Sequence, residues 1–245
     1  MWYYYLILNA FIISFPLLAS FEKRIRYYKK WKALGMSLLV VSTTYIVWDI
    51  IVTHIGHWSF NPKYVLDSDL LFIPLEEVLF FITVPYSCIF VYESILVFLG
   101  DKEVFFNRYL YSAIGIVFIL VSFIFFNQGY TFIVLNSVAA FFIISAWFYP
   151  HILKARAYWI YILITFGLFF IFNYILTSVP IVLYGSNFIW DIRVLTIPLE
   201  DFFYNFSMLS FYLMVYLYFK KLWGIGADSK YVSMEIGTKI YQIEK

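Results

Sequence analysis

The sequence predicts an all-α integral membrane protein with seven transmembrane helices. Of its 245 residues, 64% are hydrophobic and 13% are charged, whereas a soluble globular domain carries about 25% charged residues. The apolar residues of the long segments do not alternate with polar ones, which argues against a transmembrane β-barrel. The formal net charge is only +2, so no basic surface for nucleic acid is indicated. The single cysteine, Cys88, excludes an intrachain disulfide.

The seven predicted spans are each close to the ~20 residues that cross a bilayer as a helix. They cover residues 2–20, 34–53, 71–99, 109–127, 131–150, 158–176 and 195–219. The first span follows Met1 directly, without a basic region before it or a small-residue cleavage site. We therefore interpret it as a retained helix and not as a signal peptide.

The distribution of basic residues predicts the orientation. Fifteen of the 17 lysines and arginines lie after spans one, three, five and seven, which leaves Lys63 and Arg193 on the opposite side. Because cytoplasmic loops are enriched in Lys and Arg, we expect the N-terminus outside and the C-terminus in the cytoplasm. The chain would then be a multi-pass protein of the cell (inner) membrane, with residues 221–245 as a cytoplasmic tail.

One short motif occurs twice, 124 residues apart. Ile-Pro-Leu-Glu-Glu at residues 73–77 returns as Ile-Pro-Leu-Glu-Asp at residues 197–201. Aligning residues 45–81 with residues 169–205 without gaps gives eight identities and places Asp49 opposite Asn173. We predict a parallel internal repeat of three helices, residues 1–100 and 130–220, joined by a connecting helix at residues 101–129. An axis along the membrane normal would bring the two acidic pairs together across one central cavity.

The four acids of the motif, Glu76, Glu77, Glu200 and Asp201, are the candidate catalytic residues. A charge inside a bilayer costs roughly 2.5–3.5 kcal/mol on insertion scales, so an intramembrane acid indicates a functional site. A carboxyl group in a low-dielectric cavity tends to keep its proton and can deliver it. Adjacent helix residues project about 100° apart. We therefore expect Glu76 and Glu200 to face the cavity, with Glu77 and Asp201 as neighbours that tune or orient them.

Aromatic residues surround both motifs. They are Trp48, Phe72, Phe80 and Phe81 in the first half, and Phe172, Phe202, Phe203 and Tyr204 in the second. An aromatic ring attracts a cation by about 0.5–2 kcal/mol. A proton donor among such rings is suited to making a carbocation from an alkene.

Other polar residues have several interpretations. Asp49 and its counterpart Asn173 are candidates for the cavity. Arg193 is either a partner of Glu200 or Asp201 or part of a loop ion pair with Asp191. We expect His54 and His57 to belong to a lid over the outer face and not to a metal site. Near the other face, Glu93 is expected to extend its carboxyl group to the membrane interface.

The duplicated motif, the Trp48-Asp49 pair and the Phe202-Phe203-Tyr204-Asn205 run resemble the membrane-integral lycopene cyclases of the heterodimeric or fused type, here with both halves in one chain. The resemblance covers about residues 1–220. It implies a flavin-independent isomerase that protonates the terminal double bond of a lycopene ψ-end. The tertiary cation then closes a six-membered ring and a base removes a proton, which gives γ-carotene and then β-carotene. The resemblance assigns acid–base roles to Glu76, Glu77, Glu200 and Asp201, and it implies no cofactor or metal.

On this interpretation the substrate is lycopene or a related polyprenyl hydrocarbon that enters from the bilayer. The predicted substrate-binding residues are Trp48, Asp49, Phe80, Phe81, Asn173, Phe203, Tyr204 and Arg193. Homo-oligomerisation is left open.

Three other functions fit parts of the pattern. A proton-coupled transporter also uses repeats and buried acids, although these acids gather at the outer end of the spans. A retinal receptor would need a lysine inside the seventh span, and Lys220 and Lys221 lie only at its end. A prenyltransferase would need aspartate-rich diphosphate sites, which no span carries. The cyclase is the main hypothesis and the transporter is the alternative.

Overall fold

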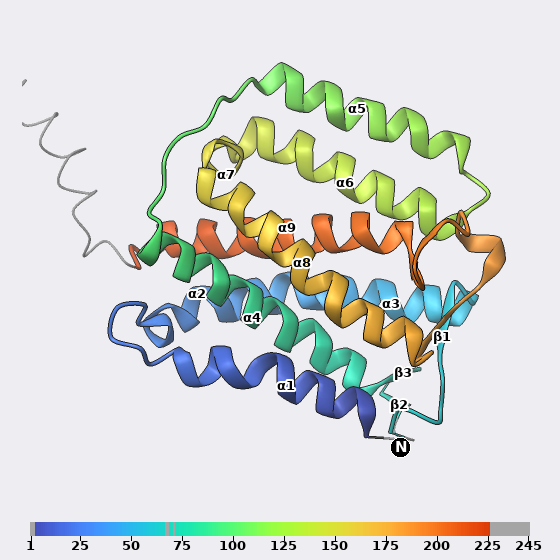
Figure 1. Cartoon of the computed structure of the whole chain (residues 1–245). Coiled ribbons are helices and arrows are strands. Elements are labelled where there is room, and N and C mark those ends of the chain that lie inside the picture. The colour runs from blue at the N-terminus through green and yellow to red at the C-terminus, as the bar shows by residue number, and fades with distance from the viewer. Residues whose placement is uncertain (1–2, 67–68, 71, 226–245) are drawn as a thin grey trace, which may run out of the picture.

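The structure, a computed structural model, describes residues 3–66, 69–70 and 72–225. Its long helices lie side by side in an elongated bundle (Figure 1). In chain order the helices are α1 (Tyr4–Ala19), α2 (Trp31–Ser37), α3 (Thr43–Ile55), α4 (Leu75–Phe98), α5 (Arg108–Ile124), α6 (Gly129–Phe148), α7 (Pro150–Lys154), α8 (Arg156–Ser178) and α9 (Leu199–Leu222). A 3₁₀ turn, η1 (Tyr27–Lys30), precedes α2, and a π-helical segment, η2 (Leu38–Ser42), joins α2 to α3. Most of the predicted tail, residues 226–245, lies outside the described residues.

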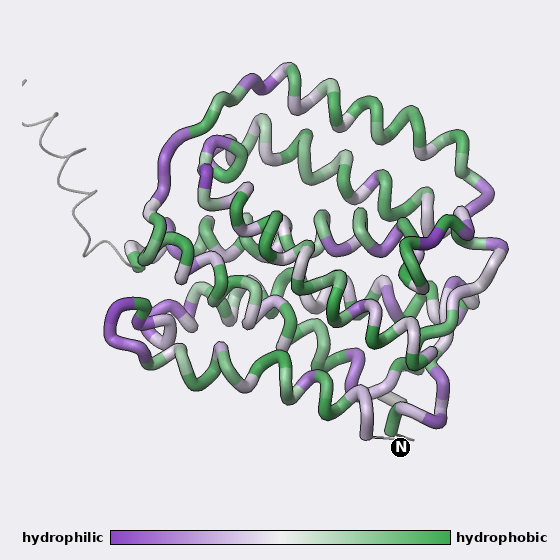
Figure 2. Tube along the Cα trace, viewed as in Figure 1, coloured by the Kyte–Doolittle hydropathy of each residue, from purple (hydrophilic) through white to green (hydrophobic). Residues whose placement is uncertain are grey.

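Several helices have the length and composition of membrane spans. Among the described residues, five continuous helical stretches qualify: Tyr27–Ile55, Leu75–Phe98, Gly129–Phe148, Arg156–Ser178 and Leu199–Leu222. Helices α1 and α5 are also apolar but have 16 and 17 residues. Hydrophobic residues run along the helices, whereas hydrophilic residues gather in the connections at both ends of the bundle (Figure 2). The chain is an all-helical integral membrane protein, as predicted, while the number of spans and their orientation stay predictions.

Local sequence explains where the helices begin and end. Gly56 takes a left-handed conformation with φ of 91° and ends α3, because glycine reaches positive φ at little cost. The Asn107 side chain accepts hydrogen bonds from the backbone N–H groups of Tyr109 and Leu110 and caps α5. Pro74 and Pro198 immediately precede α4 and α9 in an extended conformation. The third and seventh helices therefore begin at Leu75 and Leu199, four residues later than predicted.

The residues before α4 and α9 form matching hairpins. Strands β2 (Asp69–Leu70) and β3 (Ile73–Pro74) pair antiparallel, with Asp69 opposite Pro74. Strands β5 (Arg193–Val194) and β6 (Ile197–Pro198) pair in the same register, with Arg193 opposite Pro198. The two hairpins are 124 residues apart and deliver the acidic motif into its helix in the same way.

A third strand pair connects the two halves of the chain. Strand β1 (Trp58–Phe60) follows α3, and strand β4 (Val182–Tyr184) follows α8. They pair antiparallel, with Ser59 opposite Leu183, and these two residues are counterparts 124 positions apart. An antiparallel pair centred on equivalent positions is the arrangement that a two-fold axis produces. It places the segments after α3 and α8 against each other above the acidic motifs.

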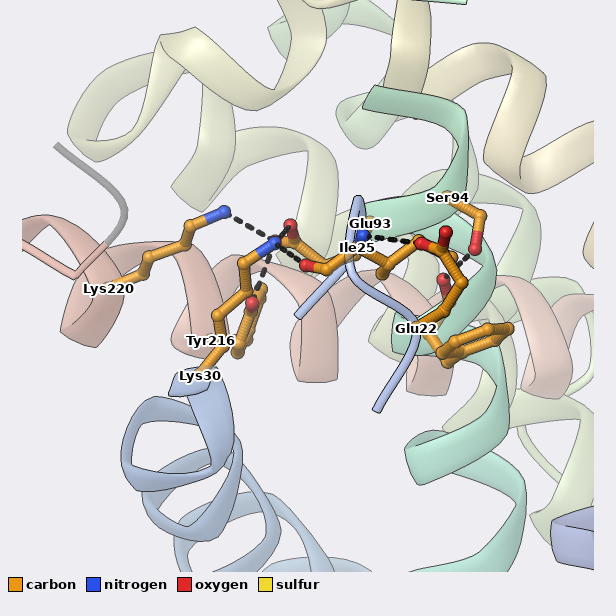
Figure 3. A network of polar contacts seen from close by, with 8 residues as sticks. Glu22, Ile25, Lys30, Glu93, Ser94, Tyr216 and Lys220 are labelled. Carbon is orange, nitrogen blue, oxygen red and sulfur yellow. Dashed lines mark hydrogen bonds and ion pairs between the residues drawn. The ribbon is translucent and has the colours of Figure 1, made fainter. Parts of the chain in front are cut away.

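The opposite end of the bundle contains a buried ion-pair cluster. Glu93 is only 1% exposed and forms ion pairs with Lys30 and Lys220, while the Tyr216 hydroxyl donates a 2.7 Å hydrogen bond to it (Figure 3). The expectation that Glu93 extends to the membrane interface is therefore wrong. The cluster connects α4 to η1 and α9. The two lysines together compensate the energetic cost of burying one carboxylate.

Candidate active site

The two acidic motifs meet at one cavity of about 70 Å³ beneath the β1–β4 strand pair. Residues from both halves of the chain line it: Tyr5, Trp58, Phe60, Glu77, Phe80, Tyr130, Phe169, Asn173, Leu176, Val182, Tyr184, Asp201, Tyr204, Asn205 and Met208. Glu77 and Asp201 are the two carboxylic acids in this lining, and they occupy equivalent positions in α4 and α9. The cavity is otherwise mostly apolar or aromatic.

The second acid of each motif faces the cavity, and the first acid does not. Glu76 is fully buried and accepts a 2.8 Å hydrogen bond from the backbone N–H of Leu66. Glu200, also fully buried, accepts hydrogen bonds from the backbone N–H of Trp190 and the Thr131 hydroxyl. The expectation that Glu76 and Glu200 face the cavity is wrong. These side chains turn back toward the preceding loop, where a carboxylate can satisfy backbone N–H groups near a helix start.

Asp201 is surrounded by hydrogen-bond donors. Its Oδ1 accepts from the Tyr130 hydroxyl at 2.7 Å, and its Oδ2 accepts from Asn173 Nδ2 at 2.8 Å and from the Tyr184 hydroxyl at 2.6 Å. Burial, with the neighbouring carboxylate, raises the pKa of the Tyr184 hydroxyl, so this group stays protonated and donates. Three neutral donors on two oxygens hold Asp201 as an acceptor.

Glu77 has a different environment. Its Oε2 accepts a 2.6 Å hydrogen bond from the Tyr5 hydroxyl, which corresponds to the bond from Tyr130 to Asp201. The position of Asn173 is taken in this half by Asp49, which interacts electrostatically with Glu77. Asp49 Oδ1 accepts from Trp58 Nε1 at 2.7 Å and from the Thr53 hydroxyl at 3.3 Å. The first half therefore has a second carboxyl group where the second half has an amide.

The aromatic residues that were predicted to bind substrate separate into three groups. Phe80 and Tyr204 line the cavity. Trp48 stacks on Tyr204 with ring centroids 5.3 Å apart and lines a neighbouring groove. Phe81 is buried beneath Phe80, and Phe203 packs against Phe118 and Trp190, so neither is part of the cavity lining.

Arg193 belongs to the loop and does not bind the motif acids. Its guanidinium forms an ion pair with Asp191 at 3.5 Å and donates a 3.1 Å hydrogen bond to the Thr196 carbonyl. It also lies over the ring of Tyr184 at 5.8 Å from the centroid, and thus touches a donor to Asp201 and not Asp201 itself. The loop ion pair is confirmed, and the alternative of a direct partner to Glu200 or Asp201 is wrong.

The outer histidines differ in burial. His57 is buried, with its ring 4.4 Å from that of Phe188, and burial lowers its pKa. The ring of His54 packs against Phe72. Within the described ranges, no three His, Cys, Asp or Glu side chains are grouped in a way that could hold a metal ion.

Several cavity residues were missed from the sequence, above all the tyrosine donors Tyr5, Tyr130 and Tyr184. Tyr5 and Tyr130 lie in the first turns of α1 and α6 and are 125 residues apart. At the repeat spacing of 124 residues Tyr5 falls opposite Gly129, so the gapless repeat comparison did not pair the two tyrosines. Tyr184 replaces Phe60 of the first half, so the repeat gave no signal for a hydroxyl there.

Comparison with known proteins identifies the family. The lycopene cyclase family model matches residues 2–95 and residues 127–219. The second matched region is displaced from the first by nearly the same number of residues as the second acidic motif is from the first. No curated protein and no solved structure matches the chain. Because the matched regions make up most of the sequence, the protein belongs to the lycopene cyclase family, with both halves of the family's unit in one polypeptide.

Proposed function

We propose that the protein is a lycopene β-cyclase, an isomerase that converts the ψ-ends of lycopene to β-rings by acid-initiated cyclisation. The observation that carries this proposal is the pair of carboxyl groups, Glu77 and Asp201, which face one cavity from the two halves of the chain. Cyclisation needs a proton donor and a base beside the same substrate end. It consumes no oxidant or reductant, because the proton that adds to the terminal double bond is balanced by a proton lost from the ring.

The two halves supply different chemistry. Two ionised carboxylates close together in a dry site repel each other, so the Glu77–Asp49 pair is suited to hold a proton. We assign the donation of that proton to Glu77, since Glu77 lines the cavity. Asp201 accepts three hydrogen bonds from neutral groups and is suited to be the base that removes a proton after ring closure.

The cavity wall would protect the cation. The rings of Phe80, Trp58 and Tyr204 line the space between the acids, and a ring face attracts a cation by about 0.5–2 kcal/mol. An apolar wall also keeps out water, which would otherwise trap the cation as an alcohol. Glu76 and Glu200 would contribute indirectly, as the side chains that hold the outer loops over the cavity.

The proposed function includes a membrane arrangement. We infer that residues 1–100 and 130–220 are duplicated units joined by the helix within residues 101–129. The matching hairpins and the β1–β4 pairing support this inference. We further propose seven spans, with the N-terminus outside, in the cell (inner) membrane. The connections that carry most of the basic residues lie at the end of the bundle where α4 and α9 end (Figure 1), and this would be the cytoplasmic side.

Expression in cells that accumulate lycopene tests the activity directly. Extracted pigments are separated by chromatography, and conversion of lycopene to γ-carotene or β-carotene is the expected result. Glu77→Gln and Asp201→Asn should each lower conversion by about 10²-fold or more, the usual contribution of a positioned acid or base. Asp191→Asn, which alters an exposed acid of the same outer loops, serves as the control and should retain activity. Unchanged lycopene with the protein present in the membrane would contradict the proposal and leave the transporter hypothesis.

A further inference from the structure

Two apolar grooves run along opposite sides of the bundle. The α4 groove, of about 440 Å³, is lined by residues of α1, α4 and α8, with Asn205 at its outer end. The α9 groove, of about 420 Å³, is lined by residues of η2, α3, α6 and α9. In each case the third helix of one half contributes to a groove between the first helix of that half and the second helix of the other. Figure 1 shows α4 lying between α1 and α8.

Eight of the 11 residues that line the α9 groove have a counterpart, 124 residues away, in the lining of the α4 groove. Val91 in the α4 groove corresponds to Val215 in the α9 groove, and Phe80 corresponds to Tyr204. Phe172 likewise corresponds to Trp48. The grooves are therefore two versions of one surface, and differences between them can be compared residue by residue.

The α4 groove adjoins the acidic cavity. It shares five lining residues with that cavity, namely Phe80, Phe169, Asn173, Leu176 and Asn205. The α9 groove shares Tyr204 alone. At that junction Trp48 stacks on Tyr204 at 5.3 Å, and Tyr45 meets the Tyr204 ring edge-on at 5.5 Å. A wall of three rings thus separates the α9 groove from the acids.

The α4 groove suits a hydrocarbon and not a polar ligand. Its hydroxyl groups are already bonded to helix carbonyls, as with Ser87 to Ile12 and Thr165 to Ile162, so they need no polar partner. Phe11 and Phe15 at its rim are 68% and 71% exposed, as expected for residues that face lipid. From Phe80 to Val91 the groove follows α4 for about 16 Å, at 1.5 Å per residue, which is more than half the thickness of a bilayer core.

We propose that the α4 groove binds the linear polyene chain that trails from the reacting end of the substrate, and that the α9 groove lies off the substrate path. This inference rests on the proposed cyclase function, because that function requires a long apolar chain to extend away from the Glu77–Asp201 cavity. The five lining residues that the groove shares with the cavity select this occupant. The α9 groove shares only Tyr204 with the cavity, and this difference distinguishes the two equivalent grooves.

A matched pair of substitutions tests the proposal. Val91→Trp fills the α4 groove about 21 Å along α4 from Glu77, and Val215→Trp makes the same change at the equivalent position of the α9 groove. Both valines are half-buried, so the two substitutions should affect the stability of the fold similarly. Each variant is assayed in membranes with lycopene and with a truncated polyene that has one ψ-end and about half the length.

Val91→Trp should lower kcat/KM for lycopene about tenfold or more, mainly through KM, and leave the truncated polyene within about twofold. The retained turnover of the short substrate also shows that the variant is folded. Val215→Trp should leave both substrates within about twofold. Equal losses in the two variants, or a loss with the short substrate as large as with lycopene, would overturn the groove assignment.

A binding measurement separates this inference from the proposed function. A linear polyene with a diazirine at its tail is irradiated with the full chain in lipid vesicles, and labelled peptides are identified by mass spectrometry. Labelling of α1, α4 and α8 that decreases in Val91→Trp supports the inference, even if the wild-type protein cyclises nothing. Labelling of α6 and α9 instead overturns it, whereas absent turnover with correct labelling contradicts only the cyclase proposal.

Discussion

Removal of one hydroxyl from the donors to Asp201 gives a quantitative test of the base assignment. Tyr184→Phe deletes the 2.6 Å hydrogen bond to Asp201 Oδ2 and keeps the ring in place. A hydrogen bond to a charged group contributes about 1.5–3 kcal/mol, and 1.36 kcal/mol corresponds to a factor of ten. The ionised form of Asp201 should therefore become about 10- to 150-fold less favourable relative to its protonated form. The two bonds from Tyr130 and Asn173 remain, so we expect the loss of activity at the lower end, about tenfold.

The assay is the initial rate of lycopene conversion in isolated membranes, for Tyr184→Phe, Asp201→Asn and the double variant. Tyr184→Phe should lower the rate of the native protein but add little to Asp201→Asn, because the charge that its hydroxyl stabilises is already gone. Tyr158→Phe is the control, since that buried hydroxyl contacts Ser210 and no acid. Additive effects of Tyr184→Phe and Asp201→Asn would refute the reasoning and show that Tyr184 acts elsewhere.

Three further predictions concern other charged or polar groups. Asp49→Asn gives the first half the amide that the second half has at this position, and we expect conversion of lycopene to fall about tenfold or more. Unchanged conversion would show that Asp49 does not help Glu77 to hold the proton. Glu93→Gln leaves Lys30 and Lys220, whose side chains are 13% and 16% exposed, without a counter-charge. The free energy of unfolding should therefore drop by about 3–5 kcal/mol, measured as thermal stability in detergent. Asp191→Asn, which removes an acid of an exposed ion pair, is the control and should change the free energy of unfolding by less than about 1 kcal/mol. Burial lowers the pKa of His57, so its neutral form stabilises the fold above the usual pKa near 6.5. The free energy of unfolding should decrease as the pH falls from about 7 toward 5, and this decrease should be smaller in His57→Gln. An equal dependence of stability on pH in both proteins would contradict this prediction.

The contrast between the two halves explains why duplication favours this chemistry. A repeat with identical acids would place two equivalent groups at one cavity, yet the proposed reaction needs one group that gives a proton and another that takes it. Asp49 corresponds to Asn173 in the repeat, and Phe60 corresponds to Tyr184. These positions differ between the halves, and they contact the two cavity acids or their neighbours. In the proposed mechanism, the two sides of one cavity thereby take different roles in proton transfer without any change in the helix arrangement.

The sequence by itself determined the class of fold and the place of the acids along it. Runs of apolar residues indicate helices in lipid because a backbone without water must satisfy its own hydrogen bonds. A motif repeated at a constant spacing indicates equivalent helix starts, and the structure does have matching hairpins at Pro74 and Pro198. Both are local properties, which composition and spacing record directly.

Only the tertiary structure decided which acid of each pair faces the cavity and what surrounds it. The direction of a side chain in the first helical turn depends on the residue at which the helix begins. The preceding strands place this residue at Leu75 and Leu199, later than the sequence predicted. Loop N–H groups then captured Glu76 and Glu200. Three other features are contacts between segments far apart in sequence. They are the hydrogen-bond donors from α1, α6 and β4, the pairing of Glu93 with two distant lysines, and the ring wall in the α9 groove. Such contacts depend on how helices pack against one another, and the periodicity of any single helix does not record them.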